Sequence, residues 1–118
     1  MKQFMILIMG TGEGMAALPE EERNAHMSKW YKWDQELVEK GIKISGEALK
    51  ADSSKVISGK NKDIKDGFFS HDKDVVIGGY YLIKADDINS AVEIAKGCPT
   101  FELEGNVEVR EVMVLEQE

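Results

Sequence analysis

Four residues of the sequence carry side chains suited to proton transfer: His26, Glu47, Asp66 and His71. An imidazole with an unperturbed pKa of ~6.5 exchanges protons at neutral pH, and a neighbouring carboxylate fixes its tautomer and stabilises its cation. We predict that His26 acts as general acid or base, that Asp66 orients it, and that Glu47 or His71 assists. Hydrolysis, isomerisation or elimination of a small polar molecule would fit, because each reaction requires only proton transfer.

Each of these residues also has a purely structural explanation. His26 can pack on a neighbouring indole at a helix border or hydrogen-bond to a backbone carbonyl. Asp66 begins an Asp-Gly pair, which forms turns without any function. Glu47 lies between a glycine and an alanine, small neighbours that leave room either for a ligand or for close packing. His71 can be an exposed loop residue, so the sequence leaves these alternatives open.

Other patterns in the chain do not predict a cofactor. Gly10, Gly12 and Gly14 follow an apolar segment, but their spacing lacks the third glycine of a dinucleotide fingerprint and the next helix begins only near Pro19. The single cysteine, Cys98, excludes an intrachain disulfide and is predicted to be a buried small hydrophobe. The two histidines lack zinc-ligand spacing. We therefore expect no metal and no cofactor.

Length and charge limit the class of protein. The 118 residues correspond to a single domain, residues 1–118, with an ordinary globular composition of 42% hydrophobic and 31% charged residues. A net charge of −7 argues against binding to nucleic acid or to an anionic membrane. No apolar run reaches the roughly 18 residues of a membrane span. The expected compartment is the cytoplasm.

Hydrophobic periodicity and turn residues predict an α+β fold. A helix follows the first strand, three strands come next, and a second helix precedes the last strand. The expected helices lie at 19–40 and 87–97, and the expected strands at 3–9, 42–49, 55–58, 75–85 and 106–116. Gly10 to Gly14 are expected to form a loop, and Gly78 and Gly79 to form a bulge or a close backbone approach. This order predicts a ferredoxin-like split βαβ sheet with its helices on one face.

The first predicted helix carries one polar residue inside its apolar stripe. Helical spacing places Met27, Trp30 and Leu37 on one face, with Asp34 near its middle. An unpaired buried carboxylate would be very costly. We therefore expect Asp34 to pair with Arg23 or a lysine, or to face a cleft.

A sheet with helices on one face leaves its other face bare. The segments 3–9 and 75–84 are apolar on both sides, so the bare face would be a large exposed apolar patch. A second copy of the chain, packed sheet to sheet, is the simplest cover. We therefore predict a homodimer.

Several segments, in order and at matching spacing, carry a resemblance that spans nearly the whole chain. They are FMILI and ALPEEE near the N-terminus, HMSKW (26–30), SGEAL (45–49), Asp66-Gly67, GGYYLIKADD (78–87), AVEIAKGCP (91–99) and VEVREV (107–112). Through them the chain resembles the YCII-related family, specifically its DGPF branch.

The resemblance implies a dimeric α/β barrel, in which two ferredoxin-like sheets face each other and each subunit lines a cleft. A His/Asp pair is implicated in enzymatic activity in the wider family, and members of this branch often look like accessories of sigma-factor gene neighbourhoods. We predict a ligand-binding or regulatory accessory protein that takes a small polar ligand; the alternative is a small-molecule hydrolase, isomerase or lyase using His26 and Asp66.

The signature loop departs from the family pattern. After Asp66-Gly67, Phe68 replaces the proline of the branch, which removes a rigid turn, and His71 takes the place of the usual glutamate. Lys73 follows at the position of a family lysine. Glu47, His71 and Lys73 are the candidate binding residues.

Overall fold

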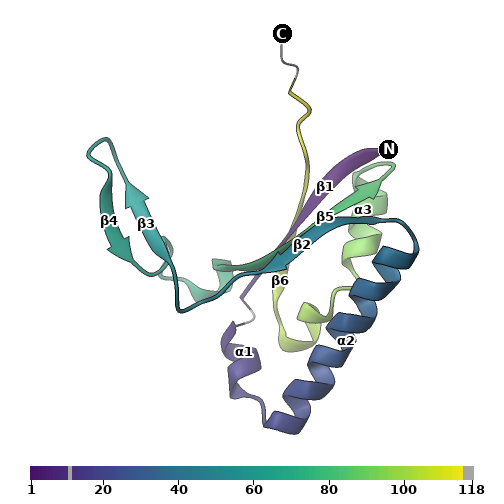
Figure 1. Cartoon of the computed structure of the whole chain (residues 1–118), viewed down its shortest axis with the longest axis horizontal. Coiled ribbons are helices and arrows are strands. Elements are labelled where there is room, and N and C mark those ends of the chain that lie inside the picture. The colour runs from purple at the N-terminus through teal and green to yellow at the C-terminus, as the bar shows by residue number, and fades with distance from the viewer. Residues whose placement is uncertain (11, 116–118) are drawn as a thin grey trace.

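A four-stranded antiparallel sheet forms the body of the protein. The computed structural model describes residues 1–10 and 12–115, and only the backbone of residues 12–14 and 73. The strands are β1 (Lys2–Met9), β2 (Lys43–Ala48), β5 (Ile77–Ala85) and β6 (Asn106–Glu111), in the order β2-β5-β1-β6 (Figure 1). The predicted mixture of helices and an antiparallel sheet is confirmed. The described strands leave an open sheet with β2 and β6 at its edges, so one chain forms no closed barrel.

The core lies between one face of this sheet and two helices, α2 (Glu20–Glu39) and α3 (Ile88–Ala95). Alternate residues of β1 point to this face, as the period of a strand requires. The buried core consists of Phe4, Ile6, Ile8, Trp33, Leu37, Ile83, Ala85, Ala91, Ala95 and Cys98. The role predicted for Cys98, a buried small hydrophobe, is confirmed.

Local sequence signals set the ends of both helices. Pro19 stands at the N-cap of α2, and three glutamates follow in the first turn, where the positive end of the helix dipole favours them. Gly41, with φ of +70°, ends the helix in the left-handed conformation that glycine tolerates. At the start of α3, the Asp87 carboxylate accepts a hydrogen bond of 2.7 Å from the backbone N–H of Ser90.

Two expectations about local structure were wrong. A loop was expected at Gly10 to Gly14, but Gly12–Ala17 form the short helix α1. Met15 of this helix lines a cleft beside the sheet, so a tertiary contact compensates for the low helix propensity of glycine. The strand β4 (Asp63–Asp66) was not predicted because it is exposed along its whole length and has no hydrophobic alternation.

The ends of two predicted strands also differ. The segment Lys73–Val75 forms a 3₁₀ turn, η1, so β5 begins at Ile77 rather than at residue 75. The last strand, expected to reach residue 116, ends at Glu111; residues Met113 to Leu115 are highly exposed, and Glu116 lies outside the described residues. A second 3₁₀ segment, η2 (Pro99–Leu103), connects α3 to β6.

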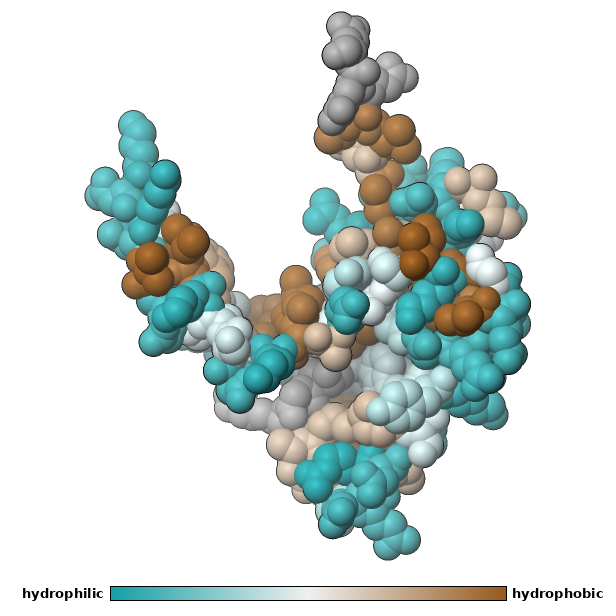
Figure 2. Space-filling view, in the orientation of Figure 1, coloured by the Kyte–Doolittle hydropathy of each residue, from teal (hydrophilic) through white to brown (hydrophobic). Residues whose placement is uncertain are grey.

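A hairpin of β3 (Lys55–Ser58) and β4 projects from the body and is called the arm here, residues 50–67 (Figure 1). The radius of gyration, 16.0 Å, exceeds the roughly 13–14 Å typical of a compact domain of this length. Ile57 and Ile64 pair across the arm and are 68% and 67% exposed. Figure 2 shows apolar surface on the arm between hydrophilic residues.

The sheet face opposite α2 and α3 is partly apolar, as the sequence predicted. Met5 pairs with Leu82, and Leu7 with Tyr80, on this side of the central strands, and all four are half-buried. Neither α2 nor α3 covers them, since both helices pack on the other face. Within the described part of the chain, no helix is both long and apolar enough to cross a bilayer.

The cap of α3 yields a prediction with a built-in control. Replacing Asp87 with Ala removes the acceptor for the Ser90 N–H and should lower Tm by roughly 3–6 °C at pH 7. The Asp87 pKa is lowered, chiefly by the Ser90 backbone hydrogen bond. The stabilisation should therefore be present above the ordinary carboxyl pKa and fade as pH falls through the lowered pKa. Thermal unfolding followed by circular dichroism measures this; an equal loss in Asp86→Ala would contradict the capping role.

Candidate functional site

A cleft of about 380 Å³ lies between helix α2 and the β2–β5 edge of the sheet. Its volume falls in the range of small-molecule sites, and its surface is mainly apolar. The described residues that line it come from β1, α1, α2, β2 and β5: Ile8, Met15, Met27, Trp30, Tyr31, Asp34, Gly46, Glu47, Ala48, Gly78, Gly79 and Tyr81.

Glycines form the sheet side of this cleft, at positions where a Cβ would make tight contacts with the neighbouring strand. A Cβ on Gly46 would lie 3.1 Å from the carbonyl oxygen of Tyr80, and a Cβ on Gly79 would lie 3.1 Å from that of Glu47. The register between β1 and β5 shifts at Gly78, so the predicted bulge is confirmed. The absence of side chains at these positions keeps the space beside α2 unfilled.

Asp34 provides the polar group of the cleft. Its Oδ1 accepts hydrogen bonds from Lys43 Nζ at 2.7 Å and from the Tyr81 hydroxyl at 2.8 Å. The Lys43 hydrogen bond is the main cause of the lowered pKa of Asp34, whereas burial, followed by the contact with Asp34, raises the pKa of Tyr81. Asp34 is therefore ionised and Tyr81 neutral at pH 7. Both alternatives predicted for Asp34, a lysine partner and a cleft, are confirmed.

Aromatic rings connect the cleft to the core. Trp30 meets Trp33 edge to face at a centroid distance of 5.9 Å, and Trp33 lies 4.8 Å from the Tyr81 ring. Lys43 Nζ lies 5.4 Å from the centre of the Tyr81 ring. These contacts fix the wall of the cleft, because a change in one ring requires its neighbours to move.

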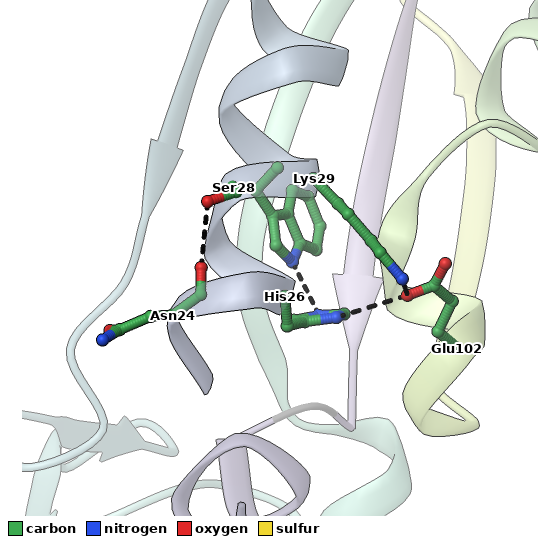
Figure 3. A network of polar contacts seen from close by, with 6 residues as sticks. Asn24, His26, Ser28, Lys29 and Glu102 are labelled. Atoms are coloured by element: carbon green, nitrogen blue, oxygen red, sulfur yellow. Dashed lines mark hydrogen bonds and ion pairs between the residues drawn. The ribbon is translucent and has the colours of Figure 1, made fainter. Parts of the chain in front are cut away.

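His26 lies outside the lining of the cleft and is only 5% exposed. Its Nε2 accepts a hydrogen bond of 3.0 Å from Trp30 Nε1, and its Nδ1 lies 3.6 Å from Glu102 Oε2 on η2 (Figure 3). Lys29 also binds this carboxylate oxygen at 2.9 Å, and its hydrogen bond is the main cause of the lowered pKa of Glu102. Both nitrogens of His26 are thus engaged: Nε2 within α2 itself, and Nδ1 in the contact between α2 and η2.

The structure does not bring the other predicted site residues to His26. Asp66 lies on the arm, where its carboxylate, 84% exposed, binds Lys55 Nζ at 2.6 Å. His71 is exposed, and the Lys73 side chain lies outside the described part of the structure. Glu47 is exposed and is the one predicted binding residue in the lining of the cleft. Within one chain His26 and Asp66 do not meet, so their joint role stays a prediction.

Sequence reasoning missed Tyr81 as a partner of Asp34 and Glu102 as a partner of His26. Tyr81 sits in a continuous apolar strand, where its hydroxyl gives no separate signal. Glu102 follows a helix stop in a segment with no recognisable periodicity. Both partners come from elements far away in sequence, so only the folded chain reveals them.

The described residues contain neither a reactive thiol nor a metal-binding cluster. Cys98 is 3% exposed, and burial raises the pKa of its thiol to about 11, so it is a poor nucleophile at neutral pH. Among the described residues, no cluster of three His, Cys, Asp or Glu side chains could hold a metal ion.

The comparison with family models matches residues 3–116 to the YCII-related domain. The chain belongs to the YCII-related domain family. The match covers all of β1 except Lys2, continues past the end of β6 and includes every element around the cleft, which confirms the family resemblance. The assignment of this YCII-related protein to the DGPF branch stays a prediction. No curated protein matches the chain.

The contacts of His26 predict that replacing it will destabilise the protein. In His26→Ala the Trp30 indole N–H loses its acceptor in a partly buried place, so the free energy of unfolding should fall by about 1–3 kcal/mol. Urea denaturation followed by tryptophan fluorescence measures the loss. Ser28→Ala, which removes only an exposed hydrogen bond to Asn24 (Figure 3), should change stability by less than about 0.5 kcal/mol. Equal stability of the two variants would contradict this role.

Proposed function

We propose that this YCII-related protein binds a small molecule in the cleft between α2 and the β2–β5 edge. The observation that carries the proposal is the combination of a glycine floor with an ionised carboxylate held beside it. An apolar enclosure with a few oriented polar groups is the usual form of a ligand site. The ligand would be a small molecule with an apolar body and one polar group that meets Asp34.

Binding is favoured over catalysis by the engagement of His26. A general base needs a nitrogen lone pair within reach of the substrate, and Nε2 already accepts the Trp30 hydrogen bond. The alternative function is that of a hydrolase, isomerase or lyase that uses His26. For that function Glu102, 3.6 Å from Nδ1, is placed as an orienting carboxylate. Asp66 would take part only if the arm of a second chain brought it to His26.

We further propose that the protein is a homodimer of two ferredoxin-like sheets that pack face to face in the manner of a dimeric α/β barrel. Half-buried apolar residues on the open face, Met5, Leu7, Tyr80 and Leu82, support this arrangement. A second copy would cover them and bury enough apolar surface to stabilise the pair.

The arm supplies a second argument for a dimer. A lone two-stranded hairpin is marginally stable in water, and this one exposes Ile57 and Ile64. Residues 50–67 carry five lysines and three aspartates, a net charge of +2, whereas the rest of the chain carries −9. The arm therefore complements the acidic body of a second copy in charge as well as in apolar surface.

If the cleft is a ligand site, it should bind an uncharged fluorescent probe. N-phenyl-1-naphthylamine should bind the wild-type protein with a rise in fluorescence. Ala48→Trp, which places an indole in the cleft, should weaken that binding by about tenfold or more. Ala51→Trp, an exposed position outside the lining, should bind the probe as wild type does. Absence of probe binding, or equal binding by both variants, would contradict the proposed site.

The dimer predicts a mass of twice the chain. Sedimentation equilibrium at micromolar concentration should give about 26 kDa, twice the 13.2 kDa of one chain. Ile57→Lys combined with Ile64→Lys should weaken association because it removes the apolar pair of the arm. Ile88→Lys, an exposed isoleucine on α3, serves as control. A monomer at this concentration would overturn the proposal.

A further inference from the structure

In the cleft, two side-chain donors already have hydrogen-bond partners, whereas one carboxylate oxygen has none among the described residues. Among the described lining side chains, the Trp30 indole N–H is donated to His26 and the Tyr81 hydroxyl to Asp34. Asp34 receives both of its hydrogen bonds at Oδ1, and no described residue binds Oδ2. The cleft therefore has few donors left for a ligand and keeps one oxygen of an ionised carboxylate as an acceptor.

The charged residues of the cleft also favour a positively charged ligand. The described lining contains no lysine, arginine or histidine, and Asp34 is its carboxylate on the side of α2. Glu47 pairs with Tyr80, so its side chain belongs to the open face of the sheet. Lys43, the cation bound to Asp34, has its Nζ on Oδ1. A negatively charged ligand would be repelled by the Asp34 carboxylate at short range, whereas a positive one would be attracted to it.

The aromatic side chains of the cleft favour a cation as well. Trp30, Tyr31 and Tyr81 contribute to its lining, and ring faces attract ammonium groups. Lys43 is an internal example of this pairing: its ammonium lies 2.7 Å from the Asp34 carboxylate and 5.4 Å from the centre of the Tyr81 ring. The same carboxylate and neighbouring rings are accessible to a second ammonium from the cleft.

We propose that the ligand of this cleft is an organic amine: a protonated amino group bound by Asp34 Oδ2, carried on an apolar or aromatic body that fills the space over the glycine floor. This inference rests on the proposed function and adds the chemical class of the ligand. Met15 and Met27, flexible apolar side chains in the lining, would contact the body of the amine.

Three probes with one body and different head groups test this class in the wild-type protein. They are 2-phenylethylamine, 2-phenylethanol and 3-phenylpropionate, titrated at pH 7 as competitors of N-phenyl-1-naphthylamine. A charge-assisted hydrogen bond should make the amine bind about tenfold tighter than the alcohol, and the carboxylate should bind most weakly. An alcohol or carboxylate that binds as tightly as the amine would overturn the amine class, while probe binding would still support the cleft as a site.

Two variants assign the preference to Asp34. In Asp34→Asn the amine should lose about tenfold in affinity while the alcohol keeps its affinity. Lys43→Met removes the competing ammonium, leaves the carboxylate in place and should raise the affinity for the amine, which provides a test even if Asp34→Asn does not fold. An unchanged amine-to-alcohol ratio in a folded Asp34→Asn, or a lower amine affinity in Lys43→Met, would overturn the proposal. Failure of the uncharged probe to bind wild type would remove the proposed function itself.

Discussion

The carboxylate of Asp34 holds together the part of the molecule on which the site depends. It lies on α2, and it accepts hydrogen bonds from Lys43 on β2 and Tyr81 on β5, so one side chain connects the helix to two strands. Asp34 and Lys43 retain side-chain exposures of 33% and 22%. The pair therefore keeps contact with solvent and avoids the full desolvation cost of a buried ion pair. The chain thus stabilises a carboxylate at the border of its core without closing the space beside it.

Residue size explains why that space exists. A Cβ at Gly46 or Gly79 would lie in tight contact with the backbone of the neighbouring strand, and the bulge at Gly78 changes the register of β5 beside β1. A helix packed on a glycine surface leaves a gap unless its own side chains fill it. Here Trp30 is instead held to His26, and Trp33 packs on Tyr81, so both rings are fixed by neighbours. Because His26 and Tyr81 hold the two indole rings in place, the space over the glycines stays open as a cleft.

Local sequence signals predicted the central strands and the two long helices of the fold. The continuous apolar run of β1, the glycine after the first helix and the aspartates before the second are local signals. The structure has a strand, a helix end at Gly41 and an N-cap at Asp87 in these places. The strand β4 lacked such a signal because all its residues are exposed. Helix α1 could not be predicted because its glycines suggest a loop. Local patterns thus identified the strands and helices that form the core, and they missed β4 and α1, whose residues carry no such pattern.

The candidate site was predictable only in part, for a related reason. Asp34 attracted notice because a carboxylate in an apolar stripe must find a partner, and the glycine and alanine around Glu47 suggested room for a ligand. The pairing of Asp34 with Tyr81 and of His26 with Glu102 depends on contacts between distant segments, which no spacing rule encodes. The pair of His26 and Asp66 has no support within one chain, because the arm carries Asp66 away from the body.

Backbone amide NMR during titration with 2-phenylethylamine would test the location of the site most directly. The amide resonances of Gly46, Gly78 and Gly79 should shift progressively and saturate, because these residues form the floor of the cleft. Those of Gly59, at the tip of the arm, and Gly105, before β6, should remain in place. Shifts confined to the arm or to the region of Glu102, with the three floor glycines unmoved, would contradict the location assigned to the ligand.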